Sequence, residues 1–193
     1  FKNKINDKNF TPEVNLDFEY FLSIGRFSKQ KNFSYLLSEF KNFTENNKEI
    51  KLLIIGDGEE KNKIQKFIKI KKMEKKILLL NRTKNVYHYM KKASVFILPS
   101  LYEEVGFVIV EAALSNLFVI SSNCPNGPSE FLNYGKSGIL FSNNKFKELT
   151  KKLNFFIEKK KKLEKKKIYT KKNCLKYTKF RHFVVLKEIL NED

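Results

Sequence analysis

Short runs of consecutive apolar residues recur along this chain of 193 residues, and glycine, asparagine, proline or serine stops most of them. We expect five strands, at residues 20–24, 50–55, 77–80, 95–98 and 118–120. The runs are apolar almost throughout instead of alternating, as strands buried on both faces of a parallel sheet require. Segments with apolar residues three or four positions apart, typical of amphipathic helices, lie between them. The sequence therefore predicts an α/β fold with a doubly wound parallel sheet.

Polar or conformationally permissive residues follow several of the expected strands. In a doubly wound sheet, ligands bind beyond the carboxyl ends of the strands. The loops that start at Gly25, Asn81, Pro99 and Ser121 lie at such ends. We therefore expect these loops to ring one crevice and to supply the binding site.

The formal net charge is +18 at neutral pH, which would suit nucleic acid, an anionic membrane surface or a phosphate-bearing ligand. Lysine is spread over the whole length, however, which indicates a general compositional bias more than a single patch. The hydrophobic fraction of 41% and the 19 phenylalanines favour a packed globule over a disordered chain. The sequence has no recognition helix, zinc knuckle or aromatic RNA-binding signature, so we do not expect a nucleic-acid partner.

The two ends of the chain differ from its middle. Residues 1–17 are polar without a clear period, and we expect a linker there, followed by a compact domain at residues 18–160. Residues 159–167 hold seven lysines, so a basic linker and a C-terminal helix are expected at residues 161–193. This lysine run suits a solvated helix or linker; the alternative is attraction to anionic lipid head groups.

Membrane-spanning and secretory signals are not apparent in the sequence. Its longest apolar runs fall well short of the roughly 20 residues that a spanning helix needs, and the N-terminus lacks a signal-peptide pattern. We expect a cytoplasmic protein, with peripheral contact at the cytoplasmic membrane face as the alternative.

Cysteine and histidine provide no metal-ligand pattern. Cys124 and Cys174 have neither CxxC nor Cys/His spacing, so two reduced thiols are expected. His88 and His182 have no recognisable triad or metal partners and suit helix packing or solvent exposure. No metal and no other cofactor is expected.

Two cations follow the first expected strand. Gly25 allows a sharp turn, and Arg26 and Lys31 fall in or near the start of a helix. Arginine grips phosphate oxygens through its planar fork, lysine supplies a point charge, and helix-terminal N–H groups add partial positive charge. The turn therefore suits a diphosphate.

Two glutamates follow the fourth expected strand. Glu103 and Glu111 stand eight residues apart across a strand-to-helix turn. Because a helix rises about 1.5 Å per residue, the two carboxylates can face different points of one extended ligand. Carboxylates accept hydrogen bonds from paired hydroxyls, and the N–H groups of Phe107 and Val108 can receive a phosphate. A sugar nucleotide offers ribose, diphosphate and hexose to these groups.

These motifs together resemble the C-terminal, donor-binding domain of retaining GT-B glycosyltransferases of the Glu-x7-Glu group, the glycosyl transferases group 1. The resemblance covers about residues 14–190, and a segment with Phe10 and Pro12 is similar to the interdomain linker of that family. Four further blocks appear in the family's order: residues 25–32 (GRFSKQKN), 54–58 (IIGDG), 85–90 (NVYHYM) and 124–130 (CPNGPSE).

The resemblance implies a Rossmann-like domain that is one half of a GT-B fold and binds a nucleoside-diphosphate sugar for retaining hexose transfer to a glycan or lipid-linked acceptor. Arg26 and Lys31 would bind the diphosphate, Glu111 the ribose and Glu103 the transferred sugar, and Glu103, Arg26 and Lys31 would be catalytic. The implied donor-binding residues are Gly25, Arg26, Lys31, Asn81, Arg82, Thr83, Glu103, Val105, Gly106, Phe107, Val108 and Glu111. The family's N-terminal domain is not found in these residues, so little transfer by this chain alone is implied.

Two departures from the family pattern and three rival functions remain. The family often has glycine at the position of Asn81 and Gly-Phe-Gly after Glu103, where this chain has residues 104–106 as EVG, and this leaves the donor sugar open. Gly56 and Gly58 also resemble the start of a dinucleotide fingerprint, but lysine occupies the third glycine position. A non-catalytic sugar-nucleotide module or truncated remnant is the main alternative, and a basic nucleic-acid-binding protein is less favoured.

Overall fold

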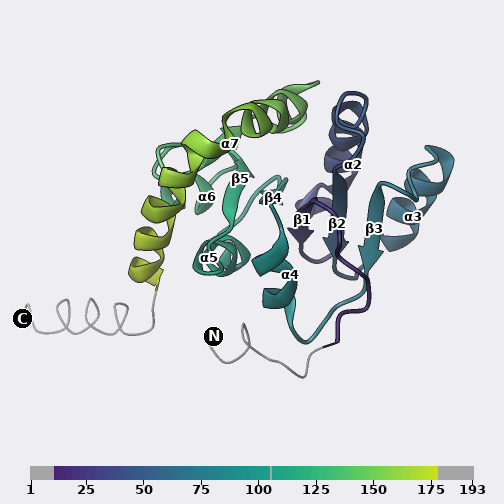
Figure 1. Cartoon of the computed structure of the whole chain (residues 1–193), viewed down its shortest axis with the longest axis horizontal. Helices are drawn as coiled ribbons and strands as arrows, with labels where there is room; N and C mark the ends of the chain where they lie inside the picture. Colours follow the sequence, from purple (N-terminus) through teal and green to yellow (C-terminus); the bar gives the residue numbers. More distant parts are fainter. Residues whose placement is uncertain (1–10, 105, 178–193) are drawn as a thin grey trace, which may run out of the picture.

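The computed structural model describes residues 11–104 and 106–177, and its six strands form one parallel sheet in the order β3-β2-β1-β4-β5-β6 (Figure 1). The strands are β1 (Tyr20–Ile24), β2 (Lys51–Ile55), β3 (Ile77–Leu80), β4 (Val95–Leu98), β5 (Phe118–Ser122) and β6 (Ile139–Phe141). The predicted fold class is confirmed. The sequence did not indicate β6 as a strand because three residues are too few to show a period.

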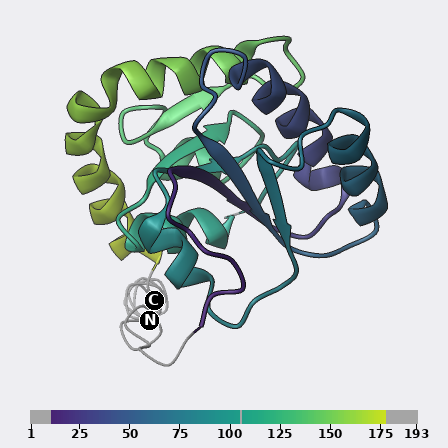
Figure 2. The same ribbon diagram turned by 45° about the vertical axis from the view of Figure 1, so that its right-hand side comes forward.

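Helices cover both faces of the sheet (Figure 2). They are α2 (Phe33–Phe43), α3 (Lys61–Ile70), α4 (Val86–Lys92), α5 (Phe107–Leu114), α6 (Pro128–Phe131) and α7 (Glu148–Asn173), with short 3-10 helices η1 (Lys29–Lys31) and η2 (Cys174–Tyr177). One core contains side chains of α2, α3 and α7, and the other those of α4, α5 and α6. In β1, Phe21 enters the first core and Leu22 the second, because successive side chains point to opposite faces.

The strand order reverses between β1 and β4. These two strands pair through Phe21 with Val95 and Leu22 with Phe96, whereas β1 pairs with β2 along its whole length. Chain connections on the two sides of such a reversal run in opposite directions, which opens a crevice at the carboxyl ends of the strands. The loops after β1 and β4 therefore meet at this point.

A close approach of two backbones makes the loop after β1 rigid. A Cβ atom at Gly56 would lie 1.9 Å from the carbonyl oxygen of Gly25, so only glycine fits there. The N–H of Gly25 donates to Ile55 at 3.1 Å, and the N–H of Phe27 donates to Asp57 at 2.9 Å. The turn that carries Arg26 is thus held against the end of β2.

The lysine run extends past residue 160, where the sequence predicted the end of the compact domain. It lies inside the 26-residue helix α7, in which Leu163 is 5% exposed and Thr170 is 1% exposed, and Cys174 beyond it is also buried. These positions lie at helical spacing on one face, so they pack while the lysines between them reach solvent. The C-terminal helix expected after Tyr177 and the side chain of His182 lie outside the described residues.

In the part of the chain that the structure describes, no helix combines the length and the apolar content needed to cross a bilayer. The long helix α7 is rich in lysine and reaches a buried position only about once per turn. Its contacts with the sheet are therefore those of an amphipathic surface helix.

A buried carboxylate joins α2 to the start of α7. Glu39 is 1% exposed, and its two oxygens accept hydrogen bonds from the N–H groups of Lys147 and Thr150, each at 2.9 Å. The Thr150 hydroxyl also donates to Glu39 at 3.0 Å. The first N–H groups of a helix have no partner within it, so this carboxylate satisfies them and its charge matches the helix dipole.

Replacement of Glu39 by glutamine should lower the free energy of unfolding by about 1–3 kcal/mol, because the amide presents N–H groups to backbone donors in a buried position. Urea unfolding followed by circular dichroism measures the change. Glu45→Gln, in an exposed position just beyond α2, is the matched control and should have little effect. Equal stability of the two variants would contradict the proposed role of Glu39.

Candidate functional site

A cleft of about 810 Å³ lies at the carboxyl ends of β1 and β4, where the strand order reverses. It brings together eight of the predicted site residues: Gly25, Arg26, Lys31, Glu103, Gly106, Phe107, Val108 and Glu111. Asn126, from the loop after β5, completes one side. Of the four loops expected to ring one crevice, those starting at Gly25, Pro99 and Ser121 line this cleft, whereas the loop starting at Asn81 does not.

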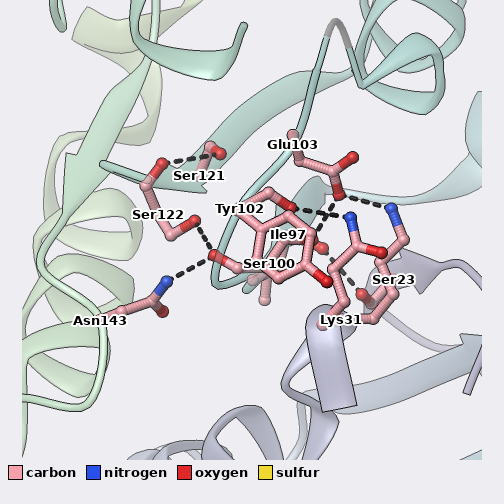
Figure 3. Close-up of polar contacts among 10 residues, drawn as sticks. Ser23, Lys31, Ile97, Ser100, Tyr102, Glu103, Ser121, Ser122 and Asn143 are labelled. Atoms are coloured by element: carbon pink, nitrogen blue, oxygen red, sulfur yellow. Dashed lines mark hydrogen bonds and ion pairs between the residues drawn. The ribbon is translucent and has the colours of Figure 1, made fainter. Parts of the chain in front are cut away.

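An ion pair between Lys31 and Glu103 crosses the cleft (Figure 3). Lys31 Nζ lies 2.5 Å from Glu103 Oε1, and the two side chains are 18% and 6% exposed. The Ser100 hydroxyl donates to the same Oε1, also at 2.5 Å. Lys31 follows β1 and Glu103 follows β4, so this pair joins the two loops that diverge from the reversal point.

Two further hydrogen bonds tie these loops together. The N–H of Leu101 donates to the carbonyl of Gln30 at 2.8 Å, and the Gln30 side chain donates to the carbonyl of Tyr102 at 2.9 Å. Gln30 and Tyr102 both line the cleft, although the sequence did not identify them. Their position depends on a contact between segments about 70 residues apart, for which the sequence carries no local signal.

The start of α5 forms the floor of the cleft. Gly106 precedes the helix with φ 65°, a left-handed conformation that favours glycine. Phe107 and Val108 follow at the helix start, where N–H groups without helical partners can receive an anion. Val105, which the sequence predicted as a donor-binding residue, lies outside the described residues.

Glu111 faces the cleft from within α5. Its Oε1 accepts a hydrogen bond from the Tyr87 hydroxyl of α4 at 2.9 Å. Burial, followed by the hydrogen bond and the charge of Glu111, raises the pKa of Tyr87 to about 12. The phenol therefore stays protonated at neutral pH and keeps donating. The sequence did not assign Tyr87 to the site, since only the packing of α4 on α5 brings it there.

Arg26 lies at the mouth of the cleft. Its side chain is 68% exposed and pairs with Glu59, with 3.3 Å between Nε and Oε2. An ion pair this exposed contributes little stability and can exchange partners. Arg26 also borders an adjoining pocket of about 310 Å³ that is lined by Arg82 and Thr83. A ligand in the main cleft can thus extend towards the loop after β3.

Asn81 is turned away from this pocket. Its side-chain oxygen accepts a hydrogen bond from Lys61 Nζ at 2.6 Å, and the residue lines a separate groove beside α3. Of the predicted loop 81–83, therefore, Arg82 and Thr83 face the adjoining pocket, while the Asn81 side chain does not. Asn81 directly follows β3 and continues the alternation of side chains along that strand. Its side chain therefore points away from the adjoining pocket.

The described residues contain no cluster of three or more histidine, cysteine, aspartate or glutamate side chains suited to a metal ion. Cys124 and Cys174 are both buried free thiols, and burial raises the pKa of Cys174 to about 11. Burial, together with the charges of Lys92 and Lys91, lowers the pKa of His88.

The comparison with protein families identifies one model, described as glycosyl transferases group 1, which matches residues 4–173. Over 133 residues the chain is 38% identical to a glycosyltransferase of Methanocaldococcus jannaschii, covering 62% of this chain and 33% of that protein. It is 35% identical over 111 residues to the amylovoran biosynthesis glycosyltransferase of Erwinia amylovora, covering 58% and 31%. The chain thus spans about a third of the length of these curated relatives.

Solved structures share the fold. TarM superposes with a TM-score of 0.81 at 22% identity, covering 93% of this chain and 36% of TarM. HepE of Anabaena in complex with UDP gives a TM-score of 0.73 at 20% identity, covering 82% of this chain and 44% of HepE. At this level of identity the likeness concerns the fold.

Replacement of Lys31 by methionine should lower the free energy of unfolding by about 1–3 kcal/mol, because the buried Glu103 carboxylate loses its charged partner. Lys29→Met, at an exposed position of the same 3-10 helix, is the control and should change stability little. Chemical unfolding of both variants provides the measurement. A Lys31 variant as stable as the Lys29 variant would show that the ion pair does not hold the two loops together.

Proposed function

The chain belongs to the glycosyl transferases group 1 family, and we propose that its cleft binds the donor, a nucleoside-diphosphate sugar. The donor would serve the transfer of a hexose, with retention of the anomeric configuration, to a glycan or lipid-linked acceptor. One observation carries this proposal: cations, a helix N-terminus and three carboxylates, those of Glu103, Glu104 and Glu111, line the same cleft at the reversal point of the sheet. The cleft therefore offers partners both for phosphate groups and for groups that carry several hydroxyls.

Each part of the donor has a chemically matched group in the cleft. Arg26 and Lys31 would bind the diphosphate together with the N–H groups at the start of α5. Glu111 would accept hydrogen bonds from the ribose hydroxyls, and Glu103 would accept those of the sugar. Phe107, the first residue of α5, and Glu111 are four residues apart, about 6 Å along the helix axis, which separates phosphate from ribose recognition.

Adjoining residues would hold the rest of the nucleotide. The pocket next to Arg26 is lined by apolar Ile24, Ile55 and Val86 besides Arg82 and Thr83. Apolar walls with a few polar groups suit the flat face and polar edge of a nucleobase. Solved relatives of this fold bind such ligands: HepE was determined with UDP-glucose, and the pneumococcal transferase GtfA with UDP and N-acetylglucosamine.

Transfer breaks the bond between sugar and phosphate, so negative charge grows on the leaving diphosphate. Arg26, Lys31 and the N–H groups of α5 would stabilise this charge more strongly in the transition state than in the bound donor. Glu103 would orient the sugar during the same step. Because protein cations take this role, we propose that transfer requires no metal ion and no further cofactor.

The acceptor would bind to a second domain. Since the chain spans about a third of its curated relatives, we propose that it is the donor half of a two-domain transferase. Alone it would bind donor and transfer little sugar, as a non-catalytic sugar-nucleotide module would. One relative, from Campylobacter jejuni, transfers N-acetylgalactosamine to a diphospho-undecaprenol-linked sugar, which supports a lipid-linked acceptor here.

Replacement of Arg26 by alanine should weaken UDP or GDP binding about 10- to 100-fold, as expected for the loss of one charge-assisted hydrogen bond. Titration calorimetry measures the affinity for the nucleoside diphosphate and, separately, for pyrophosphate. Both should weaken to a similar degree, because Arg26 is assigned to the phosphates.

Lys29→Ala provides the control for this change of charge, since Lys29 lies outside the cleft lining. Its affinity for both ligands should stay close to that of the wild-type chain. Unchanged affinity of the Arg26 variant, or an equal loss in the Lys29 variant, would overturn the phosphate assignment.

We also propose peripheral contact of α7 with the cytoplasmic face of an anionic membrane. Lys151, Lys152 and Lys166 surround a hollow of about 510 Å³ beside the edge strand β6. Phe155 and Tyr134 line the same hollow and are 44% and 74% exposed. Lysines with aromatic side chains between them suit an anionic head-group region, to which each lysine near the surface adds about 1 kcal/mol.

The combined change of Lys151, Lys152 and Lys166 to glutamine should reduce binding to phosphatidylglycerol-containing vesicles by at least about tenfold. Vesicle co-sedimentation measures this, with pure phosphatidylcholine vesicles as the uncharged reference. The control removes three lysines elsewhere, at positions 71, 72 and 75, and should bind almost as the wild-type chain does. Equal losses in the two variants would indicate net charge alone and contradict a specific α7 surface.

A further inference from the structure

Ser100 is a fully buried polar residue next to the cleft, and the proposed function above gives it no role. It lies just beyond β4 and is 0% exposed. Its hydroxyl donates to Glu103 Oε1 at 2.5 Å (Figure 3). A buried hydroxyl aimed at a carboxylate forms a charge-assisted hydrogen bond, which is stronger and more directional than a bond between neutral groups.

The two oxygens of Glu103 are in different situations. Oε1 accepts from both Lys31 and Ser100, whereas no donor to Oε2 is found within residues 11–104 and 106–177. In Figure 3 the second oxygen points away from both donors. Because Glu103 lines the cleft, Oε2 is the oxygen that can accept from a ligand hydroxyl.

Ser100 is itself held by segments far away in the sequence. Its carbonyl oxygen accepts from the Ser122 hydroxyl of β5 at 2.6 Å and from the Asn143 side chain after β6. Asn143 in turn accepts from Asn32, the residue after Lys31, at 3.4 Å. The hydrogen bonds thus form a closed ring through the loops after β1, β4 and β6, which leaves Glu103 little freedom to turn.

We propose that Ser100 is a positioning residue that orients Glu103 for recognition of the donor sugar. This inference rests on the proposed function. A phosphate oxygen that draws Lys31 towards itself removes one of the two donors on Oε1. Ser100 then remains to hold the carboxylate with Oε2 facing the sugar. Loss of the Ser100 hydroxyl should therefore weaken binding of the sugar part of the donor and leave binding of the nucleotide part unchanged.

The test compares the affinities of UDP and UDP-glucose for the chain by titration calorimetry. In Ser100→Ala the affinity for UDP should stay within about twofold of the wild-type value, whereas that for UDP-glucose should fall about tenfold. If the wild-type chain binds GDP in place of UDP, the same comparison uses GDP and GDP-mannose. A general loss of structure at the site would lower the affinities for both ligands to the same extent.

Ser23→Ala is the matched control. Ser23 is 1% exposed, and its hydroxyl donates to the carbonyl of Ile97 on the neighbouring strand at 2.8 Å, whereas the described donors to Glu103 are Lys31 and Ser100. Ser23→Ala should leave the ratio of the two affinities unchanged.

Asn143→Ala is a second variant at a half-buried position, for use if Ser100→Ala does not fold. It should lower the affinity for UDP-glucose in the same selective way, by about threefold.

A double-mutant cycle with Glu103→Gln distinguishes a positioning role of Ser100 from a general disturbance of the site structure. Once Glu103 is changed to glutamine, the carboxylate that Ser100 would orient towards the sugar is gone, so Ser100→Ala should cause little further loss of UDP-glucose affinity. Additive losses, or equal losses for UDP and UDP-glucose, would overturn the role of Ser100 while leaving donor binding intact. A wild-type chain that binds no nucleoside diphosphate would instead overturn the proposed function.

Discussion

Connections from β1 and β4 leave the sheet in opposite directions, because the order of the strands reverses between them. Backbone groups there are not covered by a crossover helix, so the ends of both strands open into a cleft. Everything polar in the site depends on this reversal. Lys31 lies in the segment after β1, and Ser100 and Glu103 lie in the loop after β4. Their hydrogen bonds connect the two halves of the sheet.

Charge is arranged differently in the cleft and on the rest of the molecule. The chain as a whole carries a net charge of +18, whereas the cleft combines two cations with Glu103, Glu104 and Glu111. A uniformly basic groove would suit any polyanion. Carboxylates among the cations favour a ligand that also carries hydroxyls, and this is why we propose a sugar nucleotide and no nucleic acid.

Rigid support beneath the cleft comes from backbone contacts as much as from side chains. Gly56 lets the turn after β2 touch the turn after β1, which fixes the segment that carries Arg26. Glu39 joins α2 to the start of α7, so the helix that follows Lys31 is also tied to the far edge of the sheet. A site held in this way loses less conformational entropy when a ligand binds.

The sequence by itself determined five of the six strands, most of the helices and the loops that line the cleft, because apolar periodicity and glycine or proline act over a few neighbouring residues. It also identified Arg26, Lys31, Glu103 and Glu111, whose residue types and spacing indicate phosphate and polyol chemistry. Only the tertiary structure decided which groups meet: the pairing of Lys31 with Glu103, the contact of Tyr87 with Glu111, the ring around Ser100 and the continuation of α7 past residue 160. Such contacts join segments that are separated in sequence, and their free energy depends on burial and distance in three dimensions, for which the local pattern of residues carries no signal.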